Sequence, residues 1–360
     1  MRILCYTNKL NHGGAERVMS ILANNLYSYG HSVILVNDYH YDDEYPINEN
    51  ITHYYIDGYY EEKKSGLLSR TARRIRFLRK ICKENNIDIL VSFISDANYR
   101  AILSTIGTST KNVISVRNDP YKDYASKYKK MISEFFYGIS DGCVFQTDRA
   151  LHFFSKRIQK HSCIIENPIS ELFFEIDNSP LKEKKIVSCG RLTKQKRFDV
   201  LINAFSIVKK EHPEYILEIY GDGELTCELR NQIQELELED SVFLMGRSSK
   251  IQIDIGNASV FVLSSDFEGM PNALLEALAL GIPCVSTDCD GGGPRSIVCN
   301  GKNGLLVPKD NPQEMAKAIL SILNDDALSN ILSMNAKMAG LSYSPENIVK
   351  KWEAFFQSLI

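Results

Sequence analysis

Short apolar runs alternate with helical patterns from one end of the chain to the other. In the first half the apolar runs are RILCYT, SVILVN, IDILVSF, NVISVR, DGCVFQT and SCIIEN, with helical patterns over residues 15–29 and 97–106. In the second half KKIVSCG, YILEIYG, SVFLMG, ASVFVLSS and IPCVSTD each lead into a polar or glycine-rich turn. Strands that are apolar on both faces and are separated by helices form parallel sheets covered on both sides. The pattern therefore predicts an α/β fold with doubly wound, Rossmann-like sheets.

The stretch NPISELFFEIDNSPLKEKK separates the two series and has the prolines and charges typical of a linker. We expect one Rossmann-like domain over residues 1–168, a linker over 169–184 and a second Rossmann-like domain over 185–342. The amphipathic C-terminal segment, residues 343–360, is expected to form a helix that crosses back onto the first domain. Ligands of such sheets bind outside the carboxyl ends of the strands. Two of these edges facing each other would form a central cleft.

Composition narrows the functional class. A length of 360 residues suits two domains of ordinary size. A formal net charge of −3 argues against a nucleic-acid partner, because nucleic-acid binders usually carry a clear basic excess. The nine cysteines include no C-x-x-C pair and are typical of free thiols in a reducing compartment. The N-terminus lacks a signal peptide's apolar stretch, and no apolar run reaches the roughly 18 residues of a membrane span. These features predict a cytoplasmic protein.

The segment SSDFEGMPNALLEALALGIPCV places Glu268 in a Gly/Pro loop and Glu276 inside the helix that follows. Pro271 suits the first helical position, because its missing N–H has no intrahelical partner there. At 3.6 residues per turn, Glu276 projects about 160° away from the apolar stripe of Leu274 and Leu278. Taken alone, the pattern fits a dipole partner and a solvated surface charge as well as it fits two ligand-binding carboxylates.

A second segment, SCGRLTKQKRFDVLINAF, ends a strand at Gly190 and places Arg191, Lys194, Lys196 and Arg197 just before an apolar helix. Cations at the N-terminal end of a helix oppose its dipole unless an anion lies nearby. A phosphate group would supply that anion, because helix N–H groups and fixed cations both bind phosphate. A solvated basic loop is the other interpretation.

A third segment, NKLNHGGAERVMSILANNL, follows the first strand and contains two glycines that permit close approach of the backbone to a ligand. A tight turn explains these glycines equally well. The segment lacks the G-x-G-x-x-G spacing of a dinucleotide site, and the chain has no G-x-x-x-x-G-K-[ST] motif. NAD-binding and P-loop functions are therefore disfavoured.

Together these motifs resemble those of one enzyme family. The E-x7-E pair, the GRLTKQK run, GGAERV, YGDGEL, FLMGR and NGLLVP have the order and spacing found in the retaining nucleotide-sugar glycosyltransferases of family four. The resemblance includes bacterial enzymes that build capsular and lipid-linked oligosaccharides. It extends over nearly the whole chain and is strongest from residue 185 to 310. It implies the GT-B fold, in which two Rossmann-like domains face a central cleft.

The resemblance also implies a donor site. Arg191 and Lys196 would hold the diphosphate of a UDP-sugar and offset the charge that develops on the leaving group. Glu268 would contact the donor sugar, and Glu276 the ribose, so Arg191, Lys196 and Glu268 are the implied catalytic residues. The other implied donor contacts are Gly14, Gly246, Arg247, Met270, Pro271 and Asn272.

The chain departs from the family pattern after NVISVR. Many members carry a histidine there, whereas this chain has SVRNDP with Arg117, Asn118 and Asp119. A similar S-x-R-N-x-P occurs in relatives that extend lipid-linked oligosaccharides. The resemblance thus implies that Arg117 binds an acceptor phosphate while Asn118 or Asp119 takes the histidine's place. A helix N-cap before Pro120 explains Asp119 equally well. His12 is a further candidate for acceptor contact.

Residues 63–83, KKSGLLSRTARRIRFLRKICK, form a basic segment in which nine of 21 residues are Lys or Arg and none is acidic. Its interleaved apolar residues predict an amphipathic helix of the kind that lies on an anionic membrane surface. On this interpretation Arg73 and Arg76 position the diphosphate of a lipid-linked acceptor. Beyond Pro120, YKDYASKYKKMISEFFYGI adds lysines, tyrosines and phenylalanines. A solvated basic face is the alternative. The apolar residues in the basic segment are Leu67, Leu68, Ile75, Phe77, Leu78 and Ile81.

No cofactor and no metal are expected. The DCD run over residues 288–290 matches the D-x-D motif of metal-dependent transferases of a different fold, but it has no companion set of acids. GT-B enzymes generally work without a bound metal. The GGGPRSIV segment that follows either shapes the donor pocket or is a simple loop.

The expected function is that of a retaining glycosyltransferase. It would move a hexose or N-acetylhexosamine from a UDP-sugar to a polyprenyl-diphosphate-linked glycan in capsule or other surface polysaccharide biosynthesis. We expect the protein in the cytoplasm, peripherally associated with the inner face of the cytoplasmic membrane. A nucleotide-sugar epimerase or hydrolase on the same fold is the alternative. A non-catalytic glycan-binding protein is disfavoured because the chain retains the Glu, Arg and Lys set.

Overall fold

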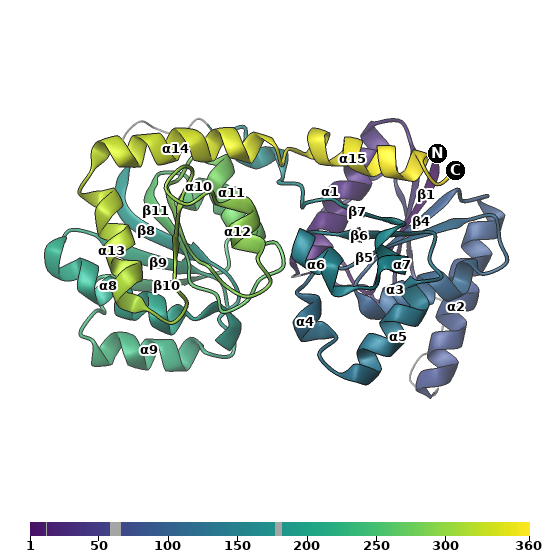
Figure 1. Cartoon of the computed structure of the whole chain (residues 1–360), viewed down its shortest axis with the longest axis horizontal. Coiled ribbons are helices and arrows are strands. Elements are labelled where there is room, and N and C mark those ends of the chain that lie inside the picture. The colour runs from purple at the N-terminus through teal and green to yellow at the C-terminus, as the bar shows by residue number, and fades with distance from the viewer. Residues whose placement is uncertain (12, 58–65, 177–181) are drawn as a thin grey trace. The chain divides into compact units, whose positions relative to one another are not determined.

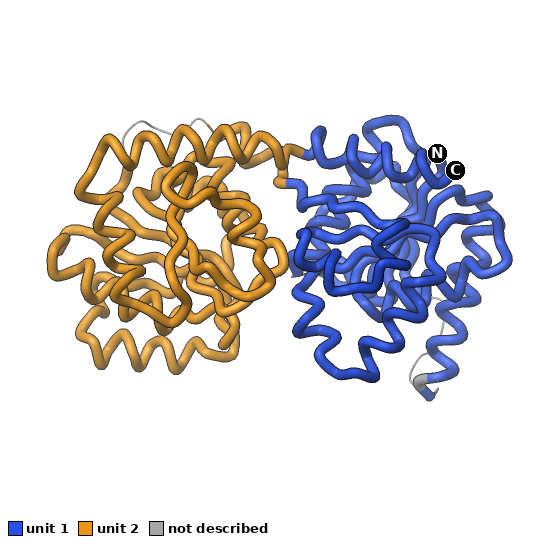
Figure 2. The backbone as a smooth tube through the Cα atoms, viewed as in Figure 1, with its two compact units in different colours: residues 1–168, 345–360 blue, residues 169–344 orange. Residues whose placement is uncertain are grey.

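The chain is organised as two α/β units. A computed structural model describes residues 1–11, 13–57, 66–176 and 182–360 (Figure 1). The N-terminal unit comprises Met1–Pro168 together with Pro345–Ile360, and the C-terminal unit comprises Ile169–Ser344 (Figure 2). Each unit has its own sheet and its own hydrophobic core.

The N-terminal unit is built on a parallel sheet with the strand order β3-β2-β1-β4-β5-β6-β7. Its helix α1 packs against α15, and α2 packs against α3. These two helix pairs lie on opposite sides of the sheet (Figure 1). The strands are β1 (Arg2–Thr7), β2 (Ser32–Asn37), β3 (Thr52–Tyr55), β4 (Ile89–Phe93), β5 (Lys111–Ser115), β6 (Gly142–Phe145) and β7 (Ser162–Ile164). The helices are α1 (Gly14–Ser28), α2 (Leu67–Glu84), α3 (Ser95–Thr105), α4 (Pro120–Asp123), α5 (Lys127–Tyr137), α6 (Asp148–Phe153), α7 (Lys156–Gln159) and α15 (Pro345–Gln357).

The C-terminal unit repeats this plan with the strand order β10-β9-β8-β11-β12-β13, and its neighbouring strands are again parallel. Helix α8 packs against α13, and α11 packs against α14. The strands are β8 (Glu183–Cys189), β9 (Ile216–Tyr220), β10 (Val242–Gly246), β11 (Ala258–Leu263), β12 (Cys284–Thr287) and β13 (Leu305–Val307). The helices are η3 (Glu171–Phe173), η4 (Lys194–Lys196), α8 (Phe198–Glu211), α9 (Thr226–Glu235), α10 (Ile251–Ile255), α11 (Asn272–Ala279), α12 (Gly293–Ile297), α13 (Pro312–Leu323) and α14 (Asp326–Leu341).

The expected fold class, two parallel-sheet α/β domains, is confirmed. Each apolar run of the sequence contains a strand of one of the two sheets. The pattern missed β3 and β13, which lie at sheet edges and are short. An edge strand is covered on fewer sides, so it does not need the continuous apolar run of a central strand. The sequence THYY of β3 is accordingly half-buried along most of its length.

The segment expected to be a linker is not a simple spacer. Ile169 and Phe173 are 2% and 4% exposed and pack into a core of the C-terminal unit. The β8 strand already begins at Glu183. Residues 177–181 lie outside the described part of the chain. A stretch that is rich in prolines and charges can therefore still contain short helices and strands, with apolar side chains such as Ile169 and Phe173 buried in the core.

The C-terminal helix α15 packs on the N-terminal unit. Trp352 and Phe356 are fully buried there. Glu353 Oε1 lies 2.5 Å from His31 Nε2 of the loop that precedes β2, and Lys351 Nζ lies 2.6 Å from Glu166 Oε2. Burial of these large aromatic side chains removes enough apolar surface from water to hold the helix in place.

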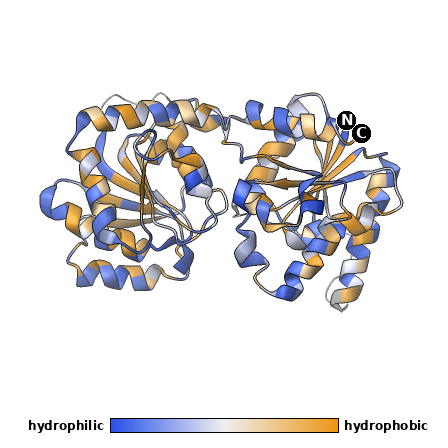
Figure 3. Ribbon diagram, viewed as in Figure 1, coloured by the Kyte–Doolittle hydropathy of each residue, from blue (hydrophilic) through white to orange (hydrophobic). Residues whose placement is uncertain are grey.

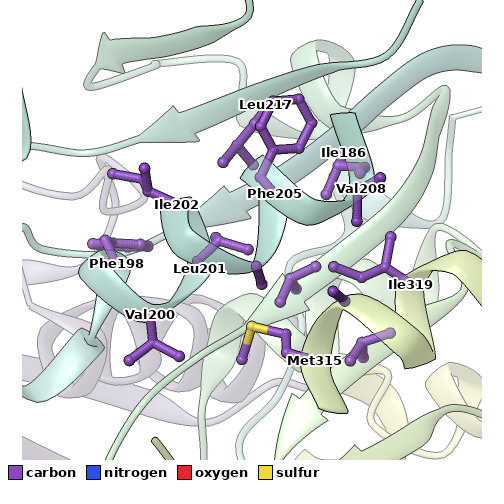
Figure 4. Close-up of a cluster of buried hydrophobic side chains, with 14 of the residues drawn as sticks. Ile186, Phe198, Val200, Leu201, Ile202, Phe205, Val208, Leu217, Met315 and Ile319 are labelled. Carbon is purple, nitrogen blue, oxygen red and sulfur yellow. The ribbon is translucent and has the colours of Figure 1, made fainter. Parts of the chain in front are cut away.

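Hydrophobic residues lie mainly on the strands and on the helix faces that cover them (Figure 3). In the C-terminal unit, α8 contributes Leu201 and Phe205, and α13 contributes Met315 and Ile319, to one buried cluster that also includes side chains of the strands (Figure 4). A second cluster includes Leu274 and other residues of α11. Within the described ranges, no helix has both the length and the apolar character needed to span a bilayer.

The contact between α11 and α14 gives a stability prediction at Gly340. A Cβ added there would lie 2.6 Å from the Cα atom of Ala279, which is backbone that cannot rotate away. Alanine normally favours a helix over glycine by about 1 kcal/mol, but overpacking costs about 1–3 kcal/mol. We expect Gly340→Ala to lower the free energy of unfolding, measured by urea titration with circular dichroism. Met338→Ala is the matched control, because Met338 is 64% exposed on the same helix. An increase in stability for Gly340→Ala would show that the two helices do not approach this closely.

Candidate active site

The C-terminal unit brings most of the sequence motifs together at the carboxyl edge of its sheet. Strand β8 leads into the GRLTKQK loop, and β11 leads into the loop that carries Glu268. These two strands are neighbours. The chain continues from β8 outward through β9 and β10, and from β11 outward through β12 and β13. The point where the strand order reverses is where ligands of such sheets bind, because the loops diverge there.

Lys196 and Glu268 form an ion pair at this point. Lys196 Nζ lies 2.6 Å from Glu268 Oε1, and Ser265 Oγ donates to the same oxygen at 2.7 Å. The two charged side chains are only 16% and 9% exposed. A charge that is largely out of water needs a close partner, so each group stabilises the other. Burial raises the pKa of the neighbouring Cys289 thiol to about 12, and the Glu268 carboxylate adds to this effect.

Side chain and backbone bonds fix the two loops to each other. Ser264 Oγ donates to the carbonyl oxygen of Lys196 at 2.7 Å. Gln195 Nε2 donates to the carbonyl oxygen of Phe267 at 2.8 Å, and Asp266 N donates to the carbonyl oxygen of Gln195 at 2.9 Å. The ion pair is therefore held by connected loops.

The cations after β8 have different environments. Arg197 donates to three carboxylates, at 3.1 Å to Asp199, 3.2 Å to Asp266 and 2.6 Å to Asp310. Its hydrogen bond to Asp199 is the largest cause of a raised pKa. Aspartates of the protein itself therefore neutralise part of the positive charge in this loop, which from the sequence alone is a possible phosphate site. Arg191 is different, because it is exposed and its guanidinium has no hydrogen-bond or ion-pair partner within the described residues.

The glycine-rich YGDGEL loop after β9 packs against the loop after β8. Gly221 has a φ of +135°, and a Cβ at this position would lie 2.0 Å from the carbonyl oxygen of Gly190. Leu192 N donates to the carbonyl oxygen of Asp222, and Leu225 N donates to that of Leu192, at 2.9 and 3.0 Å. The close approach requires glycine at position 221 and positions the start of the loop that carries Arg191.

The second glutamate of the E-x7-E pair is not a solvated surface charge. Glu276 lies in α11 and is 5% exposed, and Glu268 is 7% exposed. Met270 is also buried, and Pro271 is the N-cap of α11, so the helix begins at Asn272, one residue after the expected position. The interpretation of Glu276 as an exposed charge is therefore wrong.

The GGGPRSIV segment supports the Glu268 loop. A Cβ at Gly293 would lie 1.7 Å from the carbonyl oxygen of Gly269, so only glycine permits this contact. Glu268 N donates to the carbonyl oxygen of Asp290 at 2.8 Å. Of the two interpretations left open for this segment, the structure favours one in which it shapes the site.

Gly246 and Arg247 lie at the same sheet edge. Gly246 ends β10 with a φ of +73°, and its carbonyl oxygen accepts from Gly221 N at 2.7 Å. Arg247 Nε lies 3.0 Å from Asp222 Oδ2 in an exposed ion pair. Three strand spacings separate β10 from β11, which is about 14 Å at about 4.8 Å each. An extended ligand could therefore lie along this edge from Arg247 to Glu268.

The two aspartates of the DCD run are paired with different cations. Asp288 Oδ1 accepts from Arg295 Nε at 2.8 Å, and Asp290 Oδ2 lies 3.0 Å from Lys309 Nζ. Among the described residues, no group of three or more His, Cys, Asp and Glu side chains is arranged to hold a metal ion. Arginine and lysine are thus the observed partners of these carboxylates.

Arg117, an expected acceptor contact, lies in the N-terminal unit at the end of β5. Its Nη1 donates to Asn167 Oδ1 at 2.8 Å, and its guanidinium stacks on Phe93 and Trp352 at 4.2 and 5.3 Å from the ring centroids. Its Nε and Nη2 atoms are buried and without a hydrogen-bond partner in the described part of the chain. Burial lowers the Arg117 pKa to about 9. These contacts connect β4, β5 and α15, and phosphate binding by Arg117 stays a prediction.

The neighbours of Arg117 also have structural contacts. Asp119 is the N-cap of α4, and its Oδ1 accepts from Tyr121 N at 3.1 Å. Asn118 Nδ2 donates to Asp123 Oδ1 at 3.0 Å. The N-cap interpretation of Asp119 is confirmed, while acceptor contacts by either residue remain predictions. Gly14 is the first residue of α1, and the candidate His12 lies outside the described residues.

Residues 67–83 of the basic segment lie in α2, where Leu68 is 87% exposed but most of the apolar face does not point to solvent. Phe77, Leu78 and Ile81 are 6%, 0% and 5% exposed and belong to a core cluster of the N-terminal unit. The expectation that these residues lie on a membrane is therefore wrong, because they are already buried against the sheet. Arg76 is exposed and Arg73 is half-buried. What α2 presents to solvent is mainly its basic face.

A buried charge cluster in the N-terminal unit has no signal in the sequence pattern. Asp38 Oδ2 lies 3.4 Å from Arg74 Nη1 and 3.1 Å from Arg100 Nη2, and Tyr6 OH donates to Asp38 Oδ1 at 2.8 Å. Asp38 is 1% exposed, and the two arginines are 6% and 7% exposed. The residues come from separate elements, so their proximity is a result of the fold. Arg74 consequently does not belong to the solvent-facing charge of α2.

Comparisons with known proteins give a family match that lies within the C-terminal unit. A family model described as glycosyl transferases group 1 matches residues 170–339, which span both the Arg191 loop and the E-x7-E pair. The chain is 28% identical, over 95% of each chain, to an N-acetylgalactosamine-N,N'-diacetylbacillosaminyl-diphospho-undecaprenol 4-alpha-N-acetylgalactosaminyltransferase of Campylobacter jejuni. It is 36% identical over 61% of its length to an exopolysaccharide phosphotransferase of Streptomyces coelicolor, but the match covers only 24% of that protein.

The solved structures extend the likeness to the whole fold. TarM of S. aureus, determined with Fondaparinux, alpha-GlcNAc-glycerol and UDP, matches with a TM-score of 0.82 over 99% of this chain and 100% of that chain. The sequences are 16% identical, so this likeness concerns the fold. Residues 170–339 thus match the glycosyl transferases group 1 family, and the whole chain is similar in fold to TarM, with two parallel-sheet α/β units.

Proposed function

We propose that the protein is a retaining glycosyltransferase that uses a UDP-sugar, with a hexose or N-acetylhexosamine as the transferred group. The observation that carries the proposal is the Lys196–Glu268 ion pair at the reversal point of the sheet, in the same loop as Arg191, whose guanidinium has no partner in the described part of the chain. Cations in a loop at this edge suit a diphosphate, and a buried carboxylate suits sugar hydroxyl groups. The UDP in the similar TarM structure supports a uridine nucleotide.

The donor would lie along the carboxyl edge. The base would lie near Gly246 and Arg247 beyond β10, and the diphosphate near Arg191 and Lys196 beyond β8. The sugar would then reach Glu268, with the Met270–Asn272 backbone at the start of α11. Glu276, which is buried in the same helix, would accept hydrogen bonds from the ribose hydroxyls. The order of base, diphosphate and sugar follows that of β10, β8 and β11 in the sheet.

We propose a front-face displacement for the transfer. The bond between the anomeric carbon and the diphosphate oxygen breaks, and a bond from the anomeric carbon to the acceptor oxygen forms on the same face. The acceptor proton passes to an oxygen of the departing diphosphate. Arg191 and Lys196 would stabilise the negative charge that develops there, which is the electrostatic contribution that usually dominates catalysis.

The proposed acceptor is a polyprenyl-diphosphate-linked glycan in surface polysaccharide biosynthesis. The Campylobacter jejuni transferase described above is named for a diphospho-undecaprenol compound. Its similarity to this chain extends over 95% of each of the two chains. An acceptor of this kind resides in a membrane, so we propose peripheral association with the inner face of the cytoplasmic membrane. The exposed basic face of α2, including Arg76, would attract the anionic lipid surface and the acceptor's diphosphate.

The first test is the replacement of Lys196. We expect Lys196→Ala to weaken UDP binding about 10- to 100-fold and to lower turnover, because a charge-assisted hydrogen bond contributes about 1.5–3 kcal/mol. Binding is measured by calorimetry, and thermal unfolding without ligand checks that the variant folds. Lys194→Ala is the matched control, since Lys194 carries the same charge two residues away and is exposed. Equal UDP affinity in Lys196→Ala and the unmodified protein would contradict the proposed role.

A second test concerns stereochemistry and reaction type. We expect the glycosidic product to keep the anomeric configuration of the donor sugar, which proton NMR coupling constants report directly. Inversion at the anomeric carbon would exclude front-face displacement. Release of an epimer or of free sugar as the main product, with a competent acceptor present, would instead identify the epimerase or hydrolase alternative.

We also propose that turnover needs no metal ion. The support is that Asp288 and Asp290 are each paired with a cation of the protein itself, so Arg191 and Lys196 would balance the diphosphate charge. Assays with and without EDTA should give the same initial rate within about twofold. A rate that falls with EDTA and returns with Mg²⁺ or Mn²⁺ would contradict this.

A further inference from the structure

Helix α5 of the N-terminal unit carries a large apolar stripe on its solvent-facing side. Tyr128, Met131 and Phe135 are 66%, 62% and 61% exposed. They are three and four residues apart, so at about 100° per residue they fall within about 60° of one another. Ile139, just after the helix, adds a further exposed side chain at 41%. A contiguous exposed apolar stripe on a surface helix is a mark of an interaction site.

The opposite side of α5 is fixed to the protein. Ser133 and Tyr137 are fully buried. The Tyr137 ring lies 5.7 Å from the ring of Tyr99 in α3, and the Phe136 ring lies 5.2 Å from the same tyrosine. The stripe therefore cannot turn inward without breaking this aromatic packing. It must be covered by something outside the chain or remain in water.

Lysines border the stripe on both sides. Both Lys127 and Lys129 are exposed; at about 100° per residue, Lys127 lies about 40° from Met131 on one side of the stripe and Lys129 lies about 100° from Tyr128 on the other. Residues 120–139 contain four lysines, at positions 122, 127, 129 and 130, against two acids, Asp123 and Glu134. Glu134 accepts from Ser155 N, and Asp123 accepts from Asn118. Both acids are thus turned to partners within the protein.

We propose that the α5 stripe inserts into the interfacial layer of an anionic lipid bilayer, with Lys127 and Lys129 at the level of the headgroups. This inference rests on the proposed function, which places the acceptor in a membrane. It assigns the main apolar contact to α5, because Phe77, Leu78 and Ile81 of α2 are buried in the core and the exposed Leu68 lies only at the start of that helix. Apolar side chains flanked by lysines are the composition that such insertion requires.

The charges favour a lipid surface over a second copy of this chain. In a symmetric pair, the stripe of one copy would face the stripe of the other. Each copy would then bring the same excess of lysines to the contact, while the acids Asp123 and Glu134 already accept hydrogen bonds within their own chain. Anionic headgroups instead pair with the same lysines. An anionic lipid surface is therefore the partner that suits both the apolar stripe and the lysines around it.

The test places a fluorescent reporter in the stripe of the full-length protein. The chain has one tryptophan, Trp352, which is fully buried and supplies a constant background. Phe135→Trp is mixed with phosphatidylglycerol and phosphatidylcholine vesicles whose acyl chains carry bromine. We expect at least about twofold quenching relative to unbrominated vesicles, because an inserted side chain contacts the acyl region. Met334→Trp is the matched control, since Met334 is 64% exposed on α14 of the other unit.

A second variant measures the affinity of the stripe for vesicles. Met131→Ser combined with Phe135→Ser should weaken sedimentation with the same vesicles about tenfold or more, since the lost side chains no longer leave water. Its UDP affinity should be unchanged, which separates this inference from the proposed donor site. Vesicle binding without quenching of Phe135→Trp would overturn the α5 assignment and leave the charge of α2 as the membrane contact. Dimers that light scattering detects in the unmodified protein, and that the double variant loses, would overturn it in favour of a second copy.

Discussion

The candidate site depends on a buried ion pair between two loops that the fold brings together. Lys196 and Glu268 are 72 residues apart, yet their charged atoms lie 2.6 Å from each other because β8 and β11 are adjacent strands. Neither charge could stay out of water alone. A donor diphosphate would offer Lys196 a second anion, and a sugar would offer Glu268 hydroxyl donors. The pair thus keeps two binding groups desolvated and oriented when the site is empty.

The surrounding loops explain why the motifs contain so many small residues. Gly221 and Gly293 each allow backbone to approach another loop more closely than a Cβ would permit. Arg197 connects Asp199, Asp266 and Asp310, which lie on three different segments. These contacts occupy Arg197, whereas Arg191 and Lys194 have no side-chain partner among the described residues and Lys196 is paired only with Glu268. Much of what looks like a phosphate-binding signature in the sequence is therefore the framework that positions two residues.

The sequence predicted features that depend on local pattern and missed those that depend on long-range partners. Apolar runs located the central strands, and the order of the motifs located the Glu268 loop. The sequence could not distinguish Arg197 from Arg191, because both follow β8 within eight residues and the partners of Arg197 include Asp266 and Asp310. It also could not decide what covers an apolar helix face. Phe77 of α2 is buried, while Phe135 of α5 is 61% exposed, although both lie in lysine- or arginine-rich amphipathic helices.

The most direct measurement is a crystal structure of the protein with bound UDP. Our account predicts that the diphosphate lies within hydrogen-bond distance of both Lys196 Nζ and the Arg191 guanidinium, with the uracil toward Gly246 and Arg247. Density for UDP elsewhere on the protein, with Lys196 still paired only to Glu268 and Arg191 still without an anion, would contradict it.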